Sequence, residues 1–202
     1  LEQSARILAK GGRDALQVCA VAEQIDVPVD EAKSFFEGDH DLYIQTSRFL
    51  DERIRVAAFK ALDRLPDDAA AIEKLREVAK VYFNLAIENP TYFAAYNNCQ
   101  TATSFPNFED GIEQAESFDA FPPIFRWVLE HMRDAAVAAR GEFKHRLVVI
   151  QSLSFLCELQ GITHLATFGI MRHLSPTAKK QTFNACIETL FSGLETYGLF
   201  SR

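Results

Sequence analysis

Apolar side chains recur at intervals of three and four residues along most of the chain, which predicts helices throughout. Runs in which apolar and polar residues alternate, the pattern of a half-buried strand, do not stand out. The sequence therefore predicts an all-α protein of about nine helices. Gly11-Gly12 is expected to end the first helix near Lys10, and Asn89-Pro90 to end the fifth.

The longer expected helices follow the N-terminal region. A connecting helix is predicted over Asp41–Leu65, and Asp67 and Asp68 stand where the next helix should have its N-cap. The later helices are expected to start at Tyr92, at Pro122-Pro123 with an end near Gly141, at about His145 with an end at His173, and after Ser175-Pro176.

The stretch from Leu16 to Leu42 has the outline of a helix-turn-helix, two short helices joined by a tight turn. The turn falls at Asp26-Val27-Pro28, between two groups of apolar residues at helical spacing. The first group is Val18, Val21, Ala22 and Ile25, and the second is Val29, Ala32, Phe35 and Phe36.

This order of residues resembles the N-terminal DNA-binding domain of the TetR (tetracycline-repressor-like) regulator family. The matching positions are Gly12, Val18, Val21, Ala22, Val27, Phe36 and Leu42. The segments VYFNLAIENPTYFAAY (Val81 to Tyr96) and SFLCELQGITHL (Ser154 to Leu165) are similar to parts of the C-terminal domains of one TetR subgroup. Gln160-Gly161 stands where that subgroup has His-Gly.

The resemblance implies a helix-turn-helix domain at residues 1–45 and a helical effector-binding and dimerisation domain at 46–202. It implies a ligand-responsive transcriptional regulator, expected to be a repressor, that binds operator DNA as a homodimer. The DNA-binding residues expected from this mapping are Arg13, Gln17, Lys33 and Ser34. A TetR-like small-molecule or lipid-binding sensor or adaptor that has lost DNA binding is the alternative.

Charge weighs against DNA binding and keeps the alternative open. Residues 1–45 hold four basic and nine acidic side chains, a net charge of −5 within a chain of net charge −7. Binding to DNA gains much of its affinity from neutralising phosphates, so the acidic charge of residues 1–45 is expected to weaken it. Asp30 and Glu31 occupy the family's small polar positions in the second helix, and Asp39 occupies that of a lysine. We expect an arm before Leu1 to supply further basic contacts.

Aromatic residues recur on the fifth to eighth expected helices, where a TetR-like arrangement implies an effector cavity. A mostly apolar pocket with a few polar groups suits a hydrophobic small molecule, although plain core packing would also explain any single ring. Residues 101–121 are expected to form an aromatic loop that either covers the cavity or packs into the core. The expected ligand-binding residues are Phe83, Phe93, Tyr96, Phe105, Trp127, His131, Gln160, His164 and Phe168.

The last two expected helices predict a homodimer. The eighth is apolar nearly all round, so it requires burial on more than one side. The ninth carries a seam of apolar residues, and two such helices per chain would form a four-helix interface. The alternative is packing within one subunit. The residues expected at the dimer interface are Phe183, Ile187, Leu190, Phe191 and Leu194.

Other classes of function find little support in the sequence. The four cysteines are far apart and lack metal-ligand spacing, which favours a reduced cytoplasmic protein without a metal or other cofactor. Polar residues interrupt the apolar stretch Leu147–Met171, so a buried helix is favoured over a membrane span. His131 with Asp134, and Cys157 with Glu158 and His164, match no catalytic motif, so the protein is not expected to be an enzyme.

Overall fold

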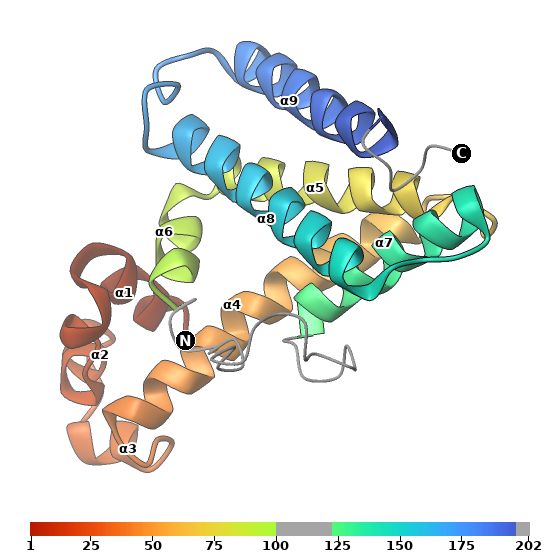
Figure 1. The fold of residues 1–202 in the computed structure, drawn as a ribbon. Helices are drawn as coiled ribbons and strands as arrows, with labels where there is room; N and C mark the ends of the chain where they lie inside the picture. The colour runs from red at the N-terminus through yellow and green to blue at the C-terminus, as the bar shows by residue number, and fades with distance from the viewer. Residues whose placement is uncertain (100–122, 197–202) are drawn as a thin grey trace. The chain divides into compact units, whose positions relative to one another are not determined.

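A computed structural model describes residues 1–99 and 123–196, which form nine α-helices and no strand (Figure 1). The predicted all-α class is confirmed. The helices are α1 (Glu2–Ala15), α2 (Val18–Gln24), α3 (Val29–Lys33), α4 (Asp39–Leu62), α5 (Ala71–Glu88), α6 (Pro90–Cys99), α7 (Pro123–Arg140), α8 (His145–Thr167) and α9 (Pro176–Thr196).

The chain divides into two compact units. The head unit comprises residues 1–57 and 88–104, and the body unit comprises residues 58–87 and 105–202. Helix α6 belongs to the head unit because it packs against α1, although it follows α5 of the body unit in sequence. The compact units therefore differ in extent from the predicted domains, and a functional boundary near residue 45 stays a prediction.

Most helix ends lie near their predicted positions, with three differences. Gly12 adopts φ +68°, so the regular part of α1 is kinked there before one further turn runs to Ala15. At the start of α5, Glu73 rather than Asp67 or Asp68 accepts a hydrogen bond from the Ala70 N–H, at 3.0 Å. Helix α8 ends at Thr167, short of the predicted His173.

In the head unit, hydrogen bonds join α1, α4 and α6. The Tyr43 hydroxyl of α4 donates to the backbone carbonyl of Asn98 at 3.1 Å. The Asn98 side-chain Nδ2 donates to the backbone carbonyl of Leu8 at 2.9 Å. Leu8 and Tyr43 are almost fully buried. These polar contacts fix α6 within a core that apolar burial builds.

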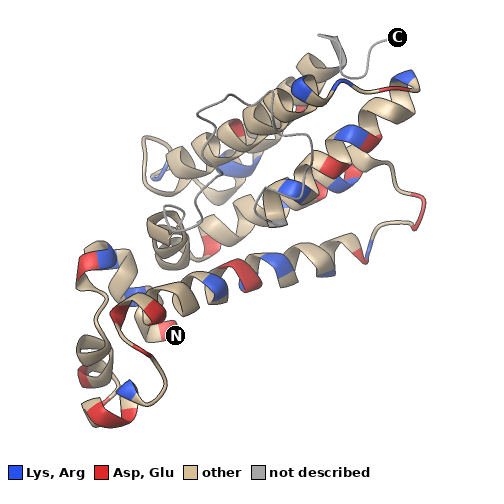
Figure 2. Ribbon diagram, turned by 60° about the horizontal axis from the view of Figure 1, so that its bottom comes forward, with Lys and Arg blue, Asp and Glu red and all other residues tan. Residues whose placement is uncertain are grey.

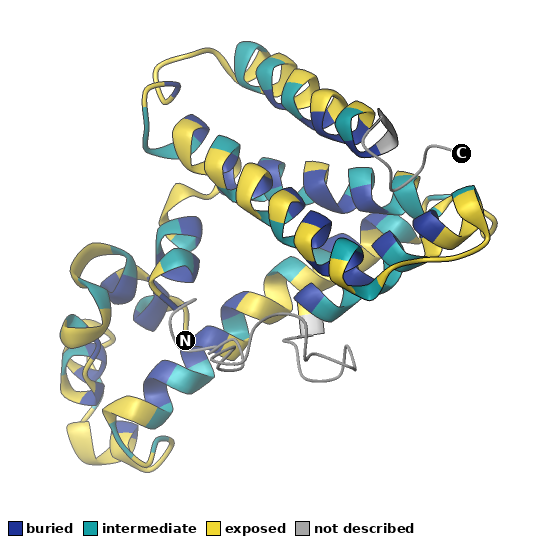
Figure 3. Cartoon of the chain, viewed as in Figure 1, coloured by how far each residue is buried: buried dark blue, intermediate teal, exposed yellow. Residues whose placement is uncertain are grey.

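The body unit has a continuous apolar core made by α5, α7, α8 and α9 (Figure 3). The rings of Phe83 and Phe183 stack with centroids 4.2 Å apart, joining α5 to α9. Phe155 of α8 and Phe191 of α9 lie 5.9 Å apart in a tilted arrangement. Among the described helices of the whole chain, none combines the length and apolarity that crossing a membrane requires.

Candidate functional site

The helix-turn-helix is built by α2, a short turn and α3. Val18, Val21 and Ala22 are buried on one side of α2, as their spacing predicts. In the turn, Asp26 has φ +56°, and the Val27 N–H donates to the Ala22 carbonyl at 3.1 Å. A residue in this left-handed conformation reverses the chain within few residues, as a helix-turn-helix requires.

Helix α3 is solvent-facing apart from one residue. Ala32 is its sole buried residue, and every other side chain from Pro28 to Phe35 is exposed. Ile25, Val29 and Phe35 lie at helical spacing with the buried residues, but their side chains are 50%, 37% and 68% exposed. Since α3 ends at Lys33, helical spacing no longer decides the direction of Phe35. Such a helix has free side chains with which to meet a partner.

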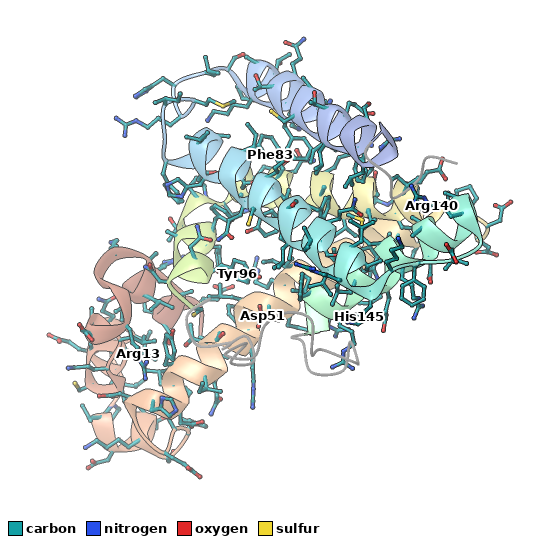
Figure 4. The ribbon with its side chains drawn as sticks, in the orientation of Figure 1. Arg13, Asp51, Phe83, Tyr96, Arg140 and His145 are labelled. Atoms are coloured by element: carbon teal, nitrogen blue, oxygen red, sulfur yellow. The ribbon has the colours of Figure 1, made fainter. Side chains whose placement is uncertain are left out.

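The four residues expected to bind DNA are all exposed. The guanidinium of Arg13, which Figure 4 labels, lies over the Tyr43 ring, 4.6 Å from its centroid. Its Nη2 is 3.2 Å from His40 Nδ1. Gln17 precedes α2, and its Oε1 accepts a hydrogen bond from the Cys19 thiol at 3.5 Å. Lys33 and Ser34 follow each other at the end of α3. Their role in DNA binding stays a prediction.

Two carboxylates at the start of α4 have structural partners. Asp39 Oδ1 accepts a hydrogen bond from the Val18 N–H at 2.7 Å and so caps the first turn of α2. Asp41 Oδ2 accepts from the Glu37 N–H at 3.1 Å and from Gln45 Nε2 at 2.8 Å. Helix ends favour such acceptors, so these acids contribute to folding as well as to the surface charge.

The exposed surface of α3 carries more negative than positive charge. Asp30 and Glu31 lie in its first turn and Lys33 in its last. Figure 2 colours the acidic and basic positions of the ribbon. The carboxylates of Asp30 and Glu31 are exposed to solvent, because Ala32 is the buried residue of this helix. Carboxylates repel phosphates, whereas cationic side chains such as those of Lys33 and Arg13 attract them.

The residues expected to bind an effector are divided between the units. Phe93 and Tyr96 are buried in the head unit, and Phe105 lies outside the described residues. In the body unit, the Phe83 ring stacks in the core. The ring centroids of Trp127 and His131 are 3.9 Å apart, and those of His164 and Phe168 are 5.5 Å apart. Gln160 is half-buried, and His164 is exposed on α8. Their joint role in a pocket stays a prediction.

Two buried polar groups escaped the sequence prediction. Gln151 is 8% exposed and Ser152 is fully buried, both on the core-facing side of α8. Within the part of the chain that the structure describes, Gln151 Oε1 and Ser152 Oγ have no hydrogen-bond partner. Leaving such a group without a partner costs about 1–3 kcal/mol. Only the interruption of an apolar helix by polar residues could have indicated them in advance.

The side chains predicted at the dimer interface lie inside a single chain. Each is buried within the body-unit core, so its burial does not depend on a second copy; these are Phe183, Ile187, Leu190, Phe191 and Leu194. The outward side of α8 is different. It exposes Ile150, Ser154, Cys157, Gly161 and Leu165, spaced at helical intervals. A homodimer through α8 and α9 stays a prediction, and the residues available for it are these outward ones.

The His131 and Asp134 side chains each contact another neighbour. The His131 ring stacks on Trp127, its Nδ1 is 2.9 Å from the Trp127 carbonyl, and burial lowers its pKa. The Asp134 carboxylate binds Arg133 at 2.8 Å. Burial also raises the pKa of the Cys99 thiol to about 11, so it stays protonated at neutral pH. These arrangements do not resemble an activated nucleophile or base.

A helix-turn-helix head followed by a long α4 and a helical body is the fold of TetR-like regulators. A TetR-family transcriptional regulator from Haemophilus influenzae matches over 93% of this chain and 91% of its own, with a TM-score of 0.60 and 17% identity. The recognition of a TetR-like fold from sequence is thereby confirmed.

Two further solved structures share this fold. A candidate transcriptional regulator from Pseudomonas aeruginosa matches over 99% of this chain and 91% of its own, with a TM-score of 0.68 and 17% identity. A protein of unknown function from Rhodococcus matches over 95% of this chain and 91% of its own, with a TM-score of 0.68 and 16% identity. The sequence matches no protein-family model, and no curated protein matches it.

Proposed function

We propose that this protein is a ligand-responsive transcriptional regulator that binds operator DNA as a homodimer and acts as a repressor. The solvent-facing α3 of the helix-turn-helix carries this proposal, because a helix that buries only Ala32 is free to enter a major groove. The fold shared with TetR-family and other regulators supports it. Arg13, Gln17, Lys33 and Ser34 would make the contacts.

The decisive experiment is a salt titration of binding to mixed fragments of the source genome. A regulator that contacts several phosphates should lose affinity steeply as salt rises, because each contact releases counterions. Replacing both acids of α3, as Asp30→Asn with Glu31→Gln, should raise non-specific affinity by removing repulsion. The same exchange at Glu73→Gln, in the body unit, is the control. No binding of the full-length protein at low salt would reject the proposal.

A second candidate function is supported by the acidic charge of the head. With nine acidic against four basic side chains in residues 1–45, the protein would be a TetR-like sensor or adaptor that does not bind DNA. The salt titration separates the two, since the sensor should bind no fragments whatever the salt concentration. Both candidates share an effector and a dimer, which are tested separately.

The effector is proposed to be a hydrophobic small molecule bound in the body unit. Gln151 Oε1 and Ser152 Oγ support a ligand with a hydroxyl or amine that satisfies them. Bound effector would shift the equilibrium between two spacings of the head units through α4, as a ligand does when it binds one state more tightly. The double variant Gln151→Leu with Ser152→Ala should lose affinity for such a ligand while the free protein keeps its fold by circular dichroism.

The dimer is proposed to form through the outward side of α8 together with α9. Ser154, Cys157 and Gly161 are small or slender, so two α8 helices could approach closely there. In a Cys19→Ser background, mild oxidation should cross-link two chains through Cys157. The further Cys157→Ser exchange should abolish the cross-link. A purely monomeric protein in sedimentation velocity would reject the dimer, whatever the result with DNA.

A further inference from the structure

The connection between α8 and α9, residues 168–175, is a hydrogen-bonded turn that presents one aliphatic side chain to solvent. The Phe168 N–H donates to the His164 carbonyl at 2.8 Å, the Met171 N–H to the Leu165 carbonyl at 3.1 Å, and the Leu174 N–H to the Met171 carbonyl at 3.0 Å. Met171 points into the core and is 9% exposed. The turn is therefore anchored at its centre.

Ile170, next to this anchor, is 86% exposed, the highest value among the large apolar side chains that the structure describes. Leu165 and Leu174 lie close to it in sequence and are 40% and 44% exposed. An isolated exposed apolar residue is ordinary, but three of them within residues 165–174 expose apolar area that contact with a partner would bury favourably. We call these three residues the Ile170 surface.

The charge around the Ile170 surface is positive, in contrast to the rest of the chain. Residues 159–187 contain no aspartate or glutamate but include Arg172, Lys179 and Lys180, whereas the whole chain has a net charge of −7. Arg172 and Lys180 are exposed. This combination fits an occupant that is both apolar and acidic, because opposite charges around an apolar contact select the partner and speed its approach.

The α3 surface of the head unit has the matching properties. Phe35, Ile25 and Val29 are its exposed apolar residues, and Asp30 and Glu31 lie among them in sequence. We propose that the Ile170 surface of one copy of this chain docks on the α3 surface of a second copy. Each surface supplies the charge that the other lacks, and both are present at equal concentration. The inference goes beyond the proposed function and requires neither DNA nor an effector.

The contact is heterologous, since it joins two different surfaces of identical chains. It shares only Leu165 with the outward side of α8 proposed for the dimer. Because each surface is small, the association is weak and transient rather than permanent. It covers the residues with which α3 would meet DNA. A docked copy therefore keeps DNA away from the head, and dilution or salt releases it.

The first experiment measures self-association of the purified full-length chain by sedimentation velocity over a range of protein concentrations. Raising salt from about 0.1 M to about 1 M shortens the Debye length from about 10 Å to about 3 Å, so association beyond the dimer should weaken. Ile170→Ser should weaken it at least about tenfold, since burial of an aliphatic side chain is lost. Val137→Ser, at another exposed aliphatic residue of the body unit, is the control and should have no effect.

The second experiment exchanges the charges of the two surfaces. One variant carries Arg172→Glu and Lys180→Glu, and the other carries Asp30→Lys and Glu31→Lys. Alone, each variant has two surfaces of like charge and should lose association beyond the dimer. Mixed, the two variants pair opposite charges again and should regain it.

Two outcomes would overturn the inference. One is that all of the separate variants associate to the same extent as the wild type, which includes the case in which none of them associates beyond the dimer at any concentration. The other is loss of association by the separate variants without recovery in the mixture, since a partner other than the head surface would then bind the turn. Neither measurement contains DNA, so failure of the docking inference and failure of the regulator proposal are distinguishable.

Discussion

The Asp39 carboxylate of α4 accepts a hydrogen bond from the Val18 backbone N–H at the start of α2, at 2.7 Å. It acts as a capping group supplied from a distant position in the sequence. We expect Asp39→Ala to destabilise the protein by about 1 kcal/mol, as the loss of a helix cap usually does. Urea unfolding followed by circular dichroism measures this.

Asp39→Asn is the matched control, because asparagine keeps the accepting oxygen and removes the negative charge. It should retain most of the stability. If the alanine and asparagine variants lose the same stability, the charge of Asp39 rather than its hydrogen bond supports α2, and the capping interpretation is wrong.

Asn98 is expected to hold α6 on α1. Its Nδ2 donates to the Leu8 carbonyl at 2.9 Å, so Asn98→Ala leaves that partly buried carbonyl without this donor. The expected loss in the free energy of unfolding is about 1–2 kcal/mol. Thr91→Ala, at an exposed position of the same helix, should cost less than about 0.5 kcal/mol. Equal effects of the two exchanges in urea unfolding would count against a specific role for Asn98.

Phe183 tests whether the apolar seam of α9 belongs to the core of one chain. Because its ring stacks on Phe83 inside the body unit, Phe183→Ala should cost about 3–5 kcal/mol. The loss should be the same in dilute and concentrated samples, since an intrachain contact does not follow mass action. Gln181→Ala, exposed on the same helix, is the control. A loss that appears only in dilute samples would instead place Phe183 at an interface between chains.

The lowered pKa of His131 should make the protein less stable at acidic pH. Burial against Trp127 lowers its pKa below the value of about 6.5 expected in the unfolded chain. The unfolded state therefore binds the proton more readily, so this contribution to stability is complete above about pH 6.5 and is lost as pH falls below it.

His131→Gln removes this contribution. Thermal unfolding of the wild type should lose more stability between about pH 7.5 and about pH 5.5 than unfolding of the variant does. His164→Gln, the same exchange at an exposed histidine of α8, is the control. If the wild type and His131→Gln respond to pH alike, His131 is not buried as a neutral ring.

The sequence predicted those parts of the fold that depend on local patterns. Helical spacing indicated the buried positions Val18, Val21 and Ala22, and Gly12 indicated the end of the regular part of α1. Both follow from neighbouring residues alone. The position of α6 beside α1 could not be predicted in this way, because it depends on the contact between Asn98 and Leu8, which are far apart in sequence.

The candidate site was harder to predict for the same reason. The apolar pattern of α9 correctly marked Phe183 and Phe191 as residues that need burial, but a pattern cannot distinguish burial in one chain from burial between two. Phe35 continues the helical spacing past Lys33, where α3 ends, so the pattern could not indicate that its side chain is exposed. The hydrogen bond from Val18 to Asp39 likewise joins two turns that no periodicity relates.

Since Ala32 alone anchors α3 in the interior, the rest of that helix has almost no share in folding the head. Its outer positions can be exchanged freely, and acidic residues there need not have disturbed the architecture beneath them. The same freedom makes the segment a natural place for redesign. Substitutions at positions 30, 31 and 33 should therefore leave the molecule stably folded.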